Sequence, residues 1–159
     1  MSKQTDFIEK YSKPVIEGSK PYKIFPSITM AQMIIESGWG QSDPLSTKYN
    51  NFFGIKASSK WTGKTIDLNT PKDAKPISKF RVYDTPLDSI TDHSKFLVEN
   101  KRYEKGGVFS ANNPEEQAIA IAKSGYAESK TYADKLIQLI NKYDLKKLDI
   151  KKVSIKKKN

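Results

Sequence analysis

One segment constrains the fold of this chain more than any other, the almost uninterrupted apolar stretch SITMAQMIIES at residues 27–37. Its apolar side chains fall on every side of a helical projection, and a helix that is apolar all round lies buried at the centre of a protein. Ser27 is the expected N-cap, and Gly38 and Gly40 should end the helix. We therefore expect a domain assembled around this helix.

The length and composition fit one such domain. A chain of 159 residues is the usual size for a single core, and seven Phe, eight Tyr and two Trp argue against disorder. The absence of cysteine excludes disulfides, thiol catalysis and thiolate-bound zinc, and a single histidine, His93, excludes a His-rich metal site. We expect no metal and no cofactor, and we expect His93 to be a core residue. No run of 18 apolar residues suggests a membrane-spanning helix.

Turn and capping signals divide the rest of the chain into short elements. Pro14 should disrupt or end a first helix at about residues 5–11. The others are an antiparallel hairpin near residues 60–83 and helices that start at Thr85-Pro86, Asn113-Pro114 and about Lys130. Helices around a small β insertion predict an α+β fold that is mostly α.

Positive charge is concentrated at the C-terminus. The formal net charge is +10, and the stretch from Lys146 to Asn159 holds seven lysines and one acid. We divide the chain into a domain at residues 1–145 and a basic tail at residues 146–159. The tail is either a solvated end or a binding element for a polyanion such as nucleic acid, anionic lipid or an acidic wall polymer.

Glu36 is the residue that fits its surroundings least well. It ends the most apolar helix, with Gln32 one turn before it and Gly40 one turn after it, so no basic residue of the same helix lies beside it. A carboxyl group in an apolar setting has a raised pKa, which is what a general acid near neutral pH requires. The alternative is that Glu36 points outward at a helix end.

The residues after Glu36 favour a sugar-binding site. Trp39 and the NNFFG stretch at residues 50–54 offer flat aromatic faces together with amide groups. Sugar rings stack their C–H faces on aromatic rings, while their hydroxyls need polar partners. Glycoside chemistry usually needs a second carboxyl group across the cleft.

A family resemblance rests on several blocks in order. PSITMAQMIIESGWGQS followed by KYNNFFGIK resembles the signature of the bacterial glucosaminidase domains of glycoside hydrolase family 73. KFRVYDTPLDSITDHSKFL, the pair Arg102-Tyr103 and SGYAESKTYADKLIQLINKYDL are similar to later blocks of that family, so the resemblance spans about residues 5–150. It implies a lysozyme-like fold in which a helical lobe and a small β-hairpin lobe flank a glycan groove. It also implies hydrolysis of the β-1,4 bond between N-acetylglucosamine and N-acetylmuramic acid in peptidoglycan, by an endo-β-N-acetylglucosaminidase.

The resemblance also assigns candidate site residues. The catalytic acid of the family maps onto Glu36. The tyrosine of the family's Tyr-Ala block, which lies beside the scissile sugar, maps onto Tyr126. The residues that would bind substrate are Trp39, Asn51, Phe53, Gly54, Tyr103 and Tyr132, of which Tyr103 is equally well explained by packing. Trp61, at the base of the expected hairpin, could pack on the lobe or reach the substrate, and packing is the favoured interpretation.

The second carboxylate is where this sequence departs from the family pattern. Many members carry a glutamate in a Thr-x-Glu-Tyr hairpin sequence, and Lys72 occupies that position here. Asp73, one residue later, is the first candidate, and Asp67 on the preceding strand is the second. If neither serves, the acetamido oxygen of the substrate could act instead.

Two other functions remain open, a muramidase or chitinase-like β-1,4 glycosidase and a non-catalytic wall-binding module. The expected partners are peptidoglycan glycan strands and, through the tail, anionic wall polymers. Since no nucleic-acid-binding motif is present, we expect no nucleic acid partner, and we expect a monomer. The enzyme should act on the cell wall or periplasmic peptidoglycan. The N-terminus shows no signal peptide, so the sequence is expected to be trimmed or exported by another route, such as phage lysis or dedicated secretion.

Overall fold

The computed structural model describes residues 2–69 and 77–150. The α-helices are α1 (Lys3–Ser19), α2 (Pro26–Ser37), α3 (Pro86–Glu99), α4 (Lys101–Lys105), α5 (Pro114–Lys123) and α6 (Tyr132–Lys142). Short 3-10 helices are η1 (Lys20–Tyr22), η2 (Val108–Ser110) and η3 (Leu145–Leu148), and the strands are β1 (Thr65–Leu68) and β2 (Ser78–Arg81). The prediction of an α+β, mostly α fold is confirmed.

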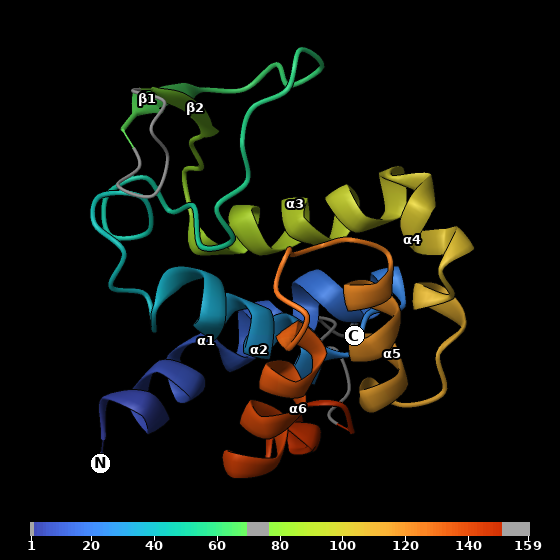
Figure 1. Cartoon of the computed structure of the whole chain (residues 1–159). Coiled ribbons are helices and arrows are strands. Elements are labelled where there is room, and N and C mark those ends of the chain that lie inside the picture. Colours follow the sequence, from blue (N-terminus) through green and yellow to red (C-terminus); the bar gives the residue numbers. More distant parts are fainter. Residues whose placement is uncertain (1, 70–76, 151–159) are drawn as a thin grey trace, which may run out of the picture.

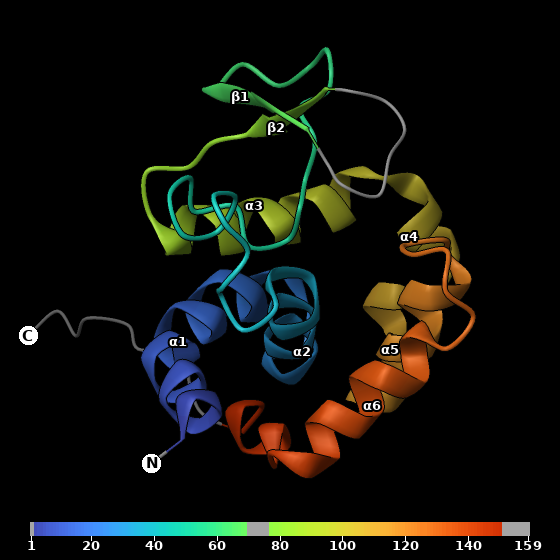
Figure 2. The same ribbon diagram turned by 60° about the vertical axis from the view of Figure 1, so that its left-hand side comes forward.

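Helix α2 forms the centre of the molecule, as its sequence predicts. Figure 2 shows it with the other α-helices arranged around it. Every residue from Pro26 to Ile34 is buried, and α2 packs against α1, α5, α6 and η3. The hydrophobic core is therefore centred on this helix, because a helix that is apolar on all sides is removed from water only when other elements pack on all sides of it.

The start of α2 differs from the prediction. The helix begins at Pro26 with Phe25 as the N-cap residue, so the assignment of Ser27 as N-cap is wrong. The Ser27 backbone N–H and hydroxyl both donate to the Asp149 carboxylate, at 2.8 and 2.7 Å. The side-chain carboxylate of Asp149 thus satisfies a free backbone donor at the N-terminus of the helix. Pro26 supplies the helical φ angle at the first position.

Helix α1 continues through Pro14, so the prediction that this proline ends or disrupts the helix is wrong. The helix runs for 17 residues and buries Phe7, Ile8, Val15 and Ile16 along its length. Burial on both sides of the proline compensates for the one backbone hydrogen bond that a proline cannot donate.

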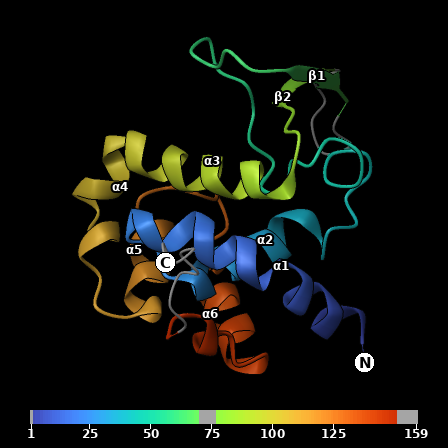
Figure 3. The same ribbon diagram turned by 180° about the vertical axis from the view of Figure 1, so that it is seen from behind.

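Helix α3 packs against α1 and lies above it in the view from behind (Figure 3). Gly18 permits this close approach, because a Cβ atom at that position would lie 2.7 Å from Ile90 Cγ2. The Ser94 hydroxyl donates to the Gly18 carbonyl oxygen at 2.6 Å and ties the two helices together. This contact holds α3 against α1, beneath the hairpin (Figure 3).

The hairpin predicted near residues 60–83 is present. Strands β1 and β2 are antiparallel, with Thr65 opposite Arg81 and Leu68 opposite Ser78. They stand apart from the helical body, above α3 (Figure 1). Two strands alone are marginally stable, and the buried Phe80 anchors them to the rest of the domain. The connection that contains Asp73 lies outside the described residues.

The capping predictions for α3 and α5 are confirmed. The Thr85 side chain accepts from the Asp88 N–H at 3.1 Å, and the Asn113 side chain accepts from the Glu116 N–H at 2.8 Å. Each helix also has a proline in its first turn. Local chemistry thus determines where both helices begin.

The folded part of the chain extends beyond residue 145, where the sequence places the start of the tail. Leu145 and Leu148 of η3 are fully buried, and Asp149 holds Ser27. Asp149 is therefore part of the packed structure, beyond the domain boundary expected at residue 145. No helix within residues 2–69 and 77–150 is both long and apolar enough to cross a membrane.

Candidate active site

A cavity of about 440 Å³ opens where the C-terminal end of α2 meets α3, α4 and two loops. Its lining combines one acid, two cations and several aromatic or apolar faces: Glu36, Phe53, Gly54, Ile55, Lys56, Phe96, Arg102, Tyr103, Tyr126 and Ala127. Of the predicted site residues, the fold thus brings Glu36, Phe53, Gly54, Tyr103 and Tyr126 to one cavity.

Glu36 lies half-buried at the wall of this cavity. The Tyr132 hydroxyl donates to Glu36 Oε2 at 3.0 Å and accepts from Gln32 Nε2 at 3.1 Å. Gln32 and Glu36 are one turn apart on α2, so they share a helix face, and Tyr132 comes from α6. Burial is the main cause that raises the pKa of Tyr132, so its phenol stays protonated and keeps donating to Glu36. Tyr132, predicted to bind substrate, instead supports the acid from behind the cavity lining.

Tyr126 lines the cavity next to this pair. Its ring stacks on that of Tyr132, with centroids 5.6 Å apart. Burial and the negative charge of Glu36 raise the pKa of Tyr126 well above its ordinary value. Tyr126 therefore presents a neutral phenol, able to donate a hydrogen bond to a substrate oxygen.

The loop at residues 51–55 contributes Phe53, Gly54 and Ile55 to the lining of the cavity. Phe53 is buried and stacks on His93 with ring centroids 4.0 Å apart, and Gly54 has a φ of +68°, in the region that favours glycine. Asn51 Oδ1 accepts from the Ile55 N–H at 3.1 Å, and Asn51 Nδ2 donates to the Ile55 carbonyl at 2.9 Å. Asn51, predicted to bind substrate, is buried and instead holds the loop in shape.

Trp39 does not line this cavity, although it was predicted to shape the groove. Its indole packs edge-on between Phe7, at 5.7 Å, and Tyr143, at 5.2 Å. Gly38, Trp39 and Gly40 all have positive φ, so the chain reverses sharply after Glu36 and carries the indole to the side facing α1. The ESGWG motif thus forms the turn at the C-terminal end of α2, and its tryptophan packs against α1.

Of the two candidates for the second carboxylate, Asp67 is not among the residues that line the cavity. Asp67 lies on β1 and forms an ion pair with Lys79 at 3.2 Å, and its side chain is 54% exposed. Asp73 is outside the described residues. Within the part of the chain that is described, no group of three or more His, Cys, Asp or Glu side chains could hold a metal ion.

His93 and Trp61 occupy the packing positions expected of them. His93 is fully buried, which lowers its pKa to about 3, so it is a neutral core residue behind Phe53. Trp61 donates from Nε1 to the Lys64 carbonyl at 3.0 Å, and the Arg81 guanidinium lies 4.6 Å from its ring centroid. Both residues therefore stabilise structure.

Sequence reasoning did not select Ile55, Lys56, Phe96, Arg102 or Ala127 as site residues, yet all line the cavity. Arg102 was named only as the neighbour of Tyr103 in the family resemblance. Burial of Tyr103 in the core places the adjacent Arg102 at the cavity. Periodicity carries no such information for a five-residue helix like α4.

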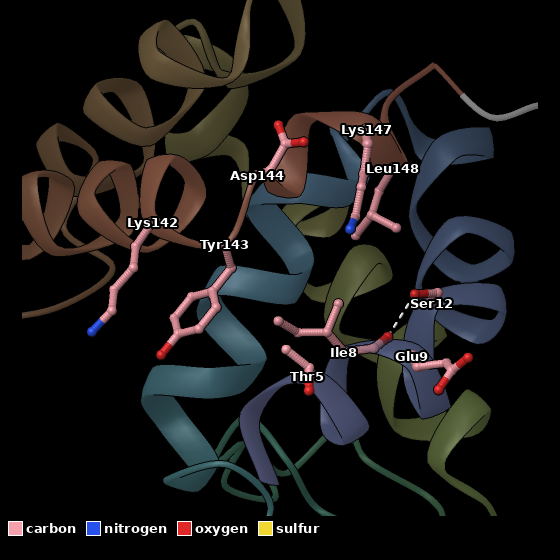
Figure 4. A pocket seen from close by; sticks show the side chains of 9 residues that line it. All are labelled: Thr5, Ile8, Glu9, Ser12, Lys142, Tyr143, Asp144, Lys147 and Leu148. Carbon is pink, nitrogen blue, oxygen red and sulfur yellow. Dashed lines mark hydrogen bonds between the residues drawn. The ribbon is translucent and has the colours of Figure 1, made fainter. Parts of the chain in front are cut away.

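A larger hollow of about 550 Å³ lies elsewhere, between α1 on one side and the end of α6 with η3 on the other (Figure 4). Its acids, Glu9 and Asp144, are exposed, and its one aromatic ring is that of Tyr143. Solvated carboxylates lack the apolar surroundings that favour a general acid. The cavity at Glu36 is therefore the better candidate for chemistry.

Comparison with known proteins identifies the family. Residues 12–145 match the Glucosaminidase family model, described as mannosyl-glycoprotein endo-β-N-acetylglucosaminidase. The exo-glucosaminidase LytG of Bacillus subtilis (strain 168) is 37% identical over 151 residues, which are 91% of this chain and 53% of that protein. The chain spans about half the length of the curated relatives it matches.

Solved structures show the same fold. The catalytic domain of the autolysin Auto from Listeria monocytogenes superposes with a TM-score of 0.80 at 30% identity, covering 94% of this chain and 89% of that one. The glycoside hydrolase domain of Salmonella typhimurium FlgJ superposes with a TM-score of 0.76 at 33% identity, covering 91% and 89%. The lysozyme-like fold expected from the sequence is thereby confirmed. Because the family model matches most of this chain, the chain belongs to the glucosaminidase family of glycoside hydrolases, family 73.

Proposed function

We propose that this protein is a peptidoglycan hydrolase that cleaves the β-1,4 bond between N-acetylglucosamine and N-acetylmuramic acid. The observation that carries the proposal is the position of Glu36, half-buried at the wall of an aromatic-lined cavity and held by Tyr132. Family membership and the names of the relatives, an exo-glucosaminidase and a peptidoglycan hydrolase, support the bond and the substrate.

Glu36 acts in this proposal as the general acid. It protonates the glycosidic oxygen as the bond to the departing sugar breaks, which avoids expelling an alkoxide. Tyr132 holds the carboxyl group in one orientation through its 3.0 Å hydrogen bond. Tyr126, a neutral phenol in the same cavity, would donate to an oxygen of the sugar at the cleaved bond. Phe53 and Phe96 supply apolar surface for sugar rings.

The second carboxylate would stabilise the positive charge that develops on the sugar ring or activate water. Asp73 is the first candidate, since it lies one residue from the position of the family glutamate. Asp67 is the second, although its carboxylate is paired with Lys79 in this structure. The third possibility is that the acetamido oxygen of the substrate takes this role.

The mode of attack along a glycan strand is a separate question. Endo cleavage is the proposal, because the cavity is open to solvent and is lined by residues from three helices and two loops. The name of the Bacillus relative indicates release of sugars from chain ends for that protein. The size distribution of products from long strands distinguishes the two modes.

We also propose that the enzyme works as a monomer at the cell wall and that its C-terminal lysines strengthen binding there. The segment KKVSIKKKN at residues 151–159 carries five lysines. Wall polymers and peptide carboxylates are anionic, and several lysines within a Debye length of about 8 Å would add to surface affinity.

Mass analysis of digested peptidoglycan tests the function. Purified walls are digested, the new reducing ends are reduced with borohydride, and the fragments are identified by mass spectrometry. The expected products end in reduced N-acetylglucosamine. Products that end in reduced N-acetylmuramic acid would identify a muramidase. Wall binding with no products would leave only a binding module.

A further inference from the structure

The cavity that holds Glu36 also contains two cations with no protein counter-ion in the described structure. Lys56 and Arg102 line it, and both side chains are exposed. Among residues 2–69 and 77–150, neither has a carboxylate within salt-bridge distance. The other arginine of the chain, Arg81, is paired with Asp92 at 2.8 Å. A carboxylate thus neutralises Arg81, while Arg102 faces a cavity meant for substrate.

The structure holds Arg102 in place. Arg102 Nη2 donates to the Tyr103 hydroxyl at 2.9 Å, and the guanidinium carbon lies 4.9 Å from the Tyr103 ring centroid. Tyr103 is fully buried, so this support is rigid. Arg102 Nη1 also lies close to Gly125, the residue before Tyr126. A Cβ atom added to Gly125 would be 3.9 Å from this nitrogen. A guanidinium restrained in this way loses less entropy when it binds a ligand.

The chemistry of a guanidinium identifies what it would bind. Arginine carries five N–H donors in a planar fork that matches a carboxylate, and among the described residues Arg102 donates one hydrogen bond, to Tyr103. A chain of N-acetylglucosamine alone has no anionic group. A muramic acid residue carries a lactyl ether that ends in a carboxyl group, either free or joined to a peptide that has carboxylates of its own. Peptidoglycan therefore offers carboxylates where chitin offers none.

We propose that Arg102, assisted by Lys56, forms an anion subsite that binds a carboxylate carried by the muramyl residue of the substrate. This inference rests on the proposed function and names what makes the enzyme prefer peptidoglycan over a neutral glycan. Within the cavity, the subsite lies between Tyr103 and the turn that holds Tyr126. It would fix the register of the strand relative to Glu36.

The test compares glycan strands that differ only in charge. Three substrates are used: peptide-free strands with free lactyl carboxylates, the same strands converted to methylamides, and strands with intact peptide stems. Wild type is compared with Arg102→Gln, Arg102→Lys and the control Lys101→Gln. The control removes one charge from the same helix at an exposed residue that does not line the cavity.

Arg102→Gln should lower kcat/KM at least about tenfold on strands with carboxylates and less than about twofold on the methylamides, because a charge-assisted hydrogen bond is lost only where there is charge. Arg102→Lys should keep part of the preference, and Lys101→Gln should keep all of it. Loss on free lactyl strands assigns the lactyl carboxylate. Loss confined to stem-bearing strands assigns a peptide carboxylate.

An equal loss by Arg102→Gln on charged and neutral strands, or no loss on either, overturns the subsite. Equilibrium binding of the same three strands to Glu36→Gln protein, with and without the Arg102 change, gives a second readout that needs no turnover. If wild type cuts a different bond, the proposed function fails, while the charge comparison still decides the role of Arg102.

Discussion

The hydroxyl of Tyr132 donates a 3.0 Å hydrogen bond to Oε2 of Glu36, although the two residues are 96 positions apart in the chain. The same hydroxyl accepts from Gln32, so the acid is fixed by a connection between α2 and α6. The orientation of Glu36 therefore depends on the packing of these two helices, and the predictions below follow from that arrangement and from the groups around it.

Glu36→Gln should retain the fold and lose activity on purified walls by about two orders of magnitude or more, since an amide keeps the shape of the side chain but cannot supply the proton. Turbidity clearance measures the activity and a thermal melt checks the fold. A folded variant that retains a tenth of wild-type clearance would show that another group is the acid.

Tyr132→Phe should move the basic limb of the kcat/KM profile to higher pH. The Tyr132 hydrogen bond stabilises the ionised form of Glu36, so its removal favours the protonated, catalytically competent form. The pH–rate profile measures the shift. Tyr143→Phe is the matched control, because Tyr143 lies near the end of the same helix and outside this cavity. Identical profiles for wild type and Tyr132→Phe would contradict the assigned role.

Asp73→Asn should reduce turnover far more than it weakens substrate binding, while Asp67→Asn should leave activity close to wild type. An exposed ion pair such as Asp67–Lys79 contributes only about 0–1 kcal/mol to stability, so Asp67→Asn should stay folded. Steady-state kinetics on soluble strands separate kcat from KM. Full activity in both variants would favour the acetamido oxygen of the substrate.

Stability should fall below neutral pH because of His93. Burial lowers its folded-state pKa to about 3 from an ordinary 6.5. Between these values the unfolded chain binds a proton that the folded chain excludes, so stability is lost as pH falls through this window, by about 2 kcal/mol at pH 5.

His93→Phe should remove this part of the pH dependence, and since His93 is the only histidine, the comparison isolates it. Urea unfolding at pH 7 and pH 5 measures the difference. At pH 7 the variant also removes two buried nitrogens that have no hydrogen-bond partner in the described structure. Parallel stability curves for the two proteins would refute the prediction.

Two truncations separate folding from wall binding. A chain that ends at Ile150 keeps Asp149 and loses the five lysines of residues 151–159, so it should melt like the full chain and bind walls less at low salt. A chain that ends at Leu148 also loses the two hydrogen bonds from Ser27 to Asp149, which should cost about 1–3 kcal/mol. Melting curves and wall pelleting at low and high salt measure both effects. Equal pelleting of the full chain and the Ile150 truncation at low salt would mean that the lysines do not contribute.

The sequence by itself determined the features that depend on neighbours along the chain. An apolar run predicts the central helix α2, and Thr85 and Asn113 predict the starts of α3 and α5. The candidate acid was also visible, because a carboxyl group at the end of so apolar a helix is unusual. These features are local, since periodicity and capping act over a few residues.

Only the tertiary structure decided which side chains meet. It places Tyr132 behind Glu36 and Arg102 at the cavity, and it turns Trp39 toward α1 instead of the cavity. It also carries α1 through Pro14 and makes Asp149 part of the fold. Each of these outcomes depends on contacts between segments distant in sequence, whose packing and buried hydrogen bonds outweigh local preferences of a few kcal/mol.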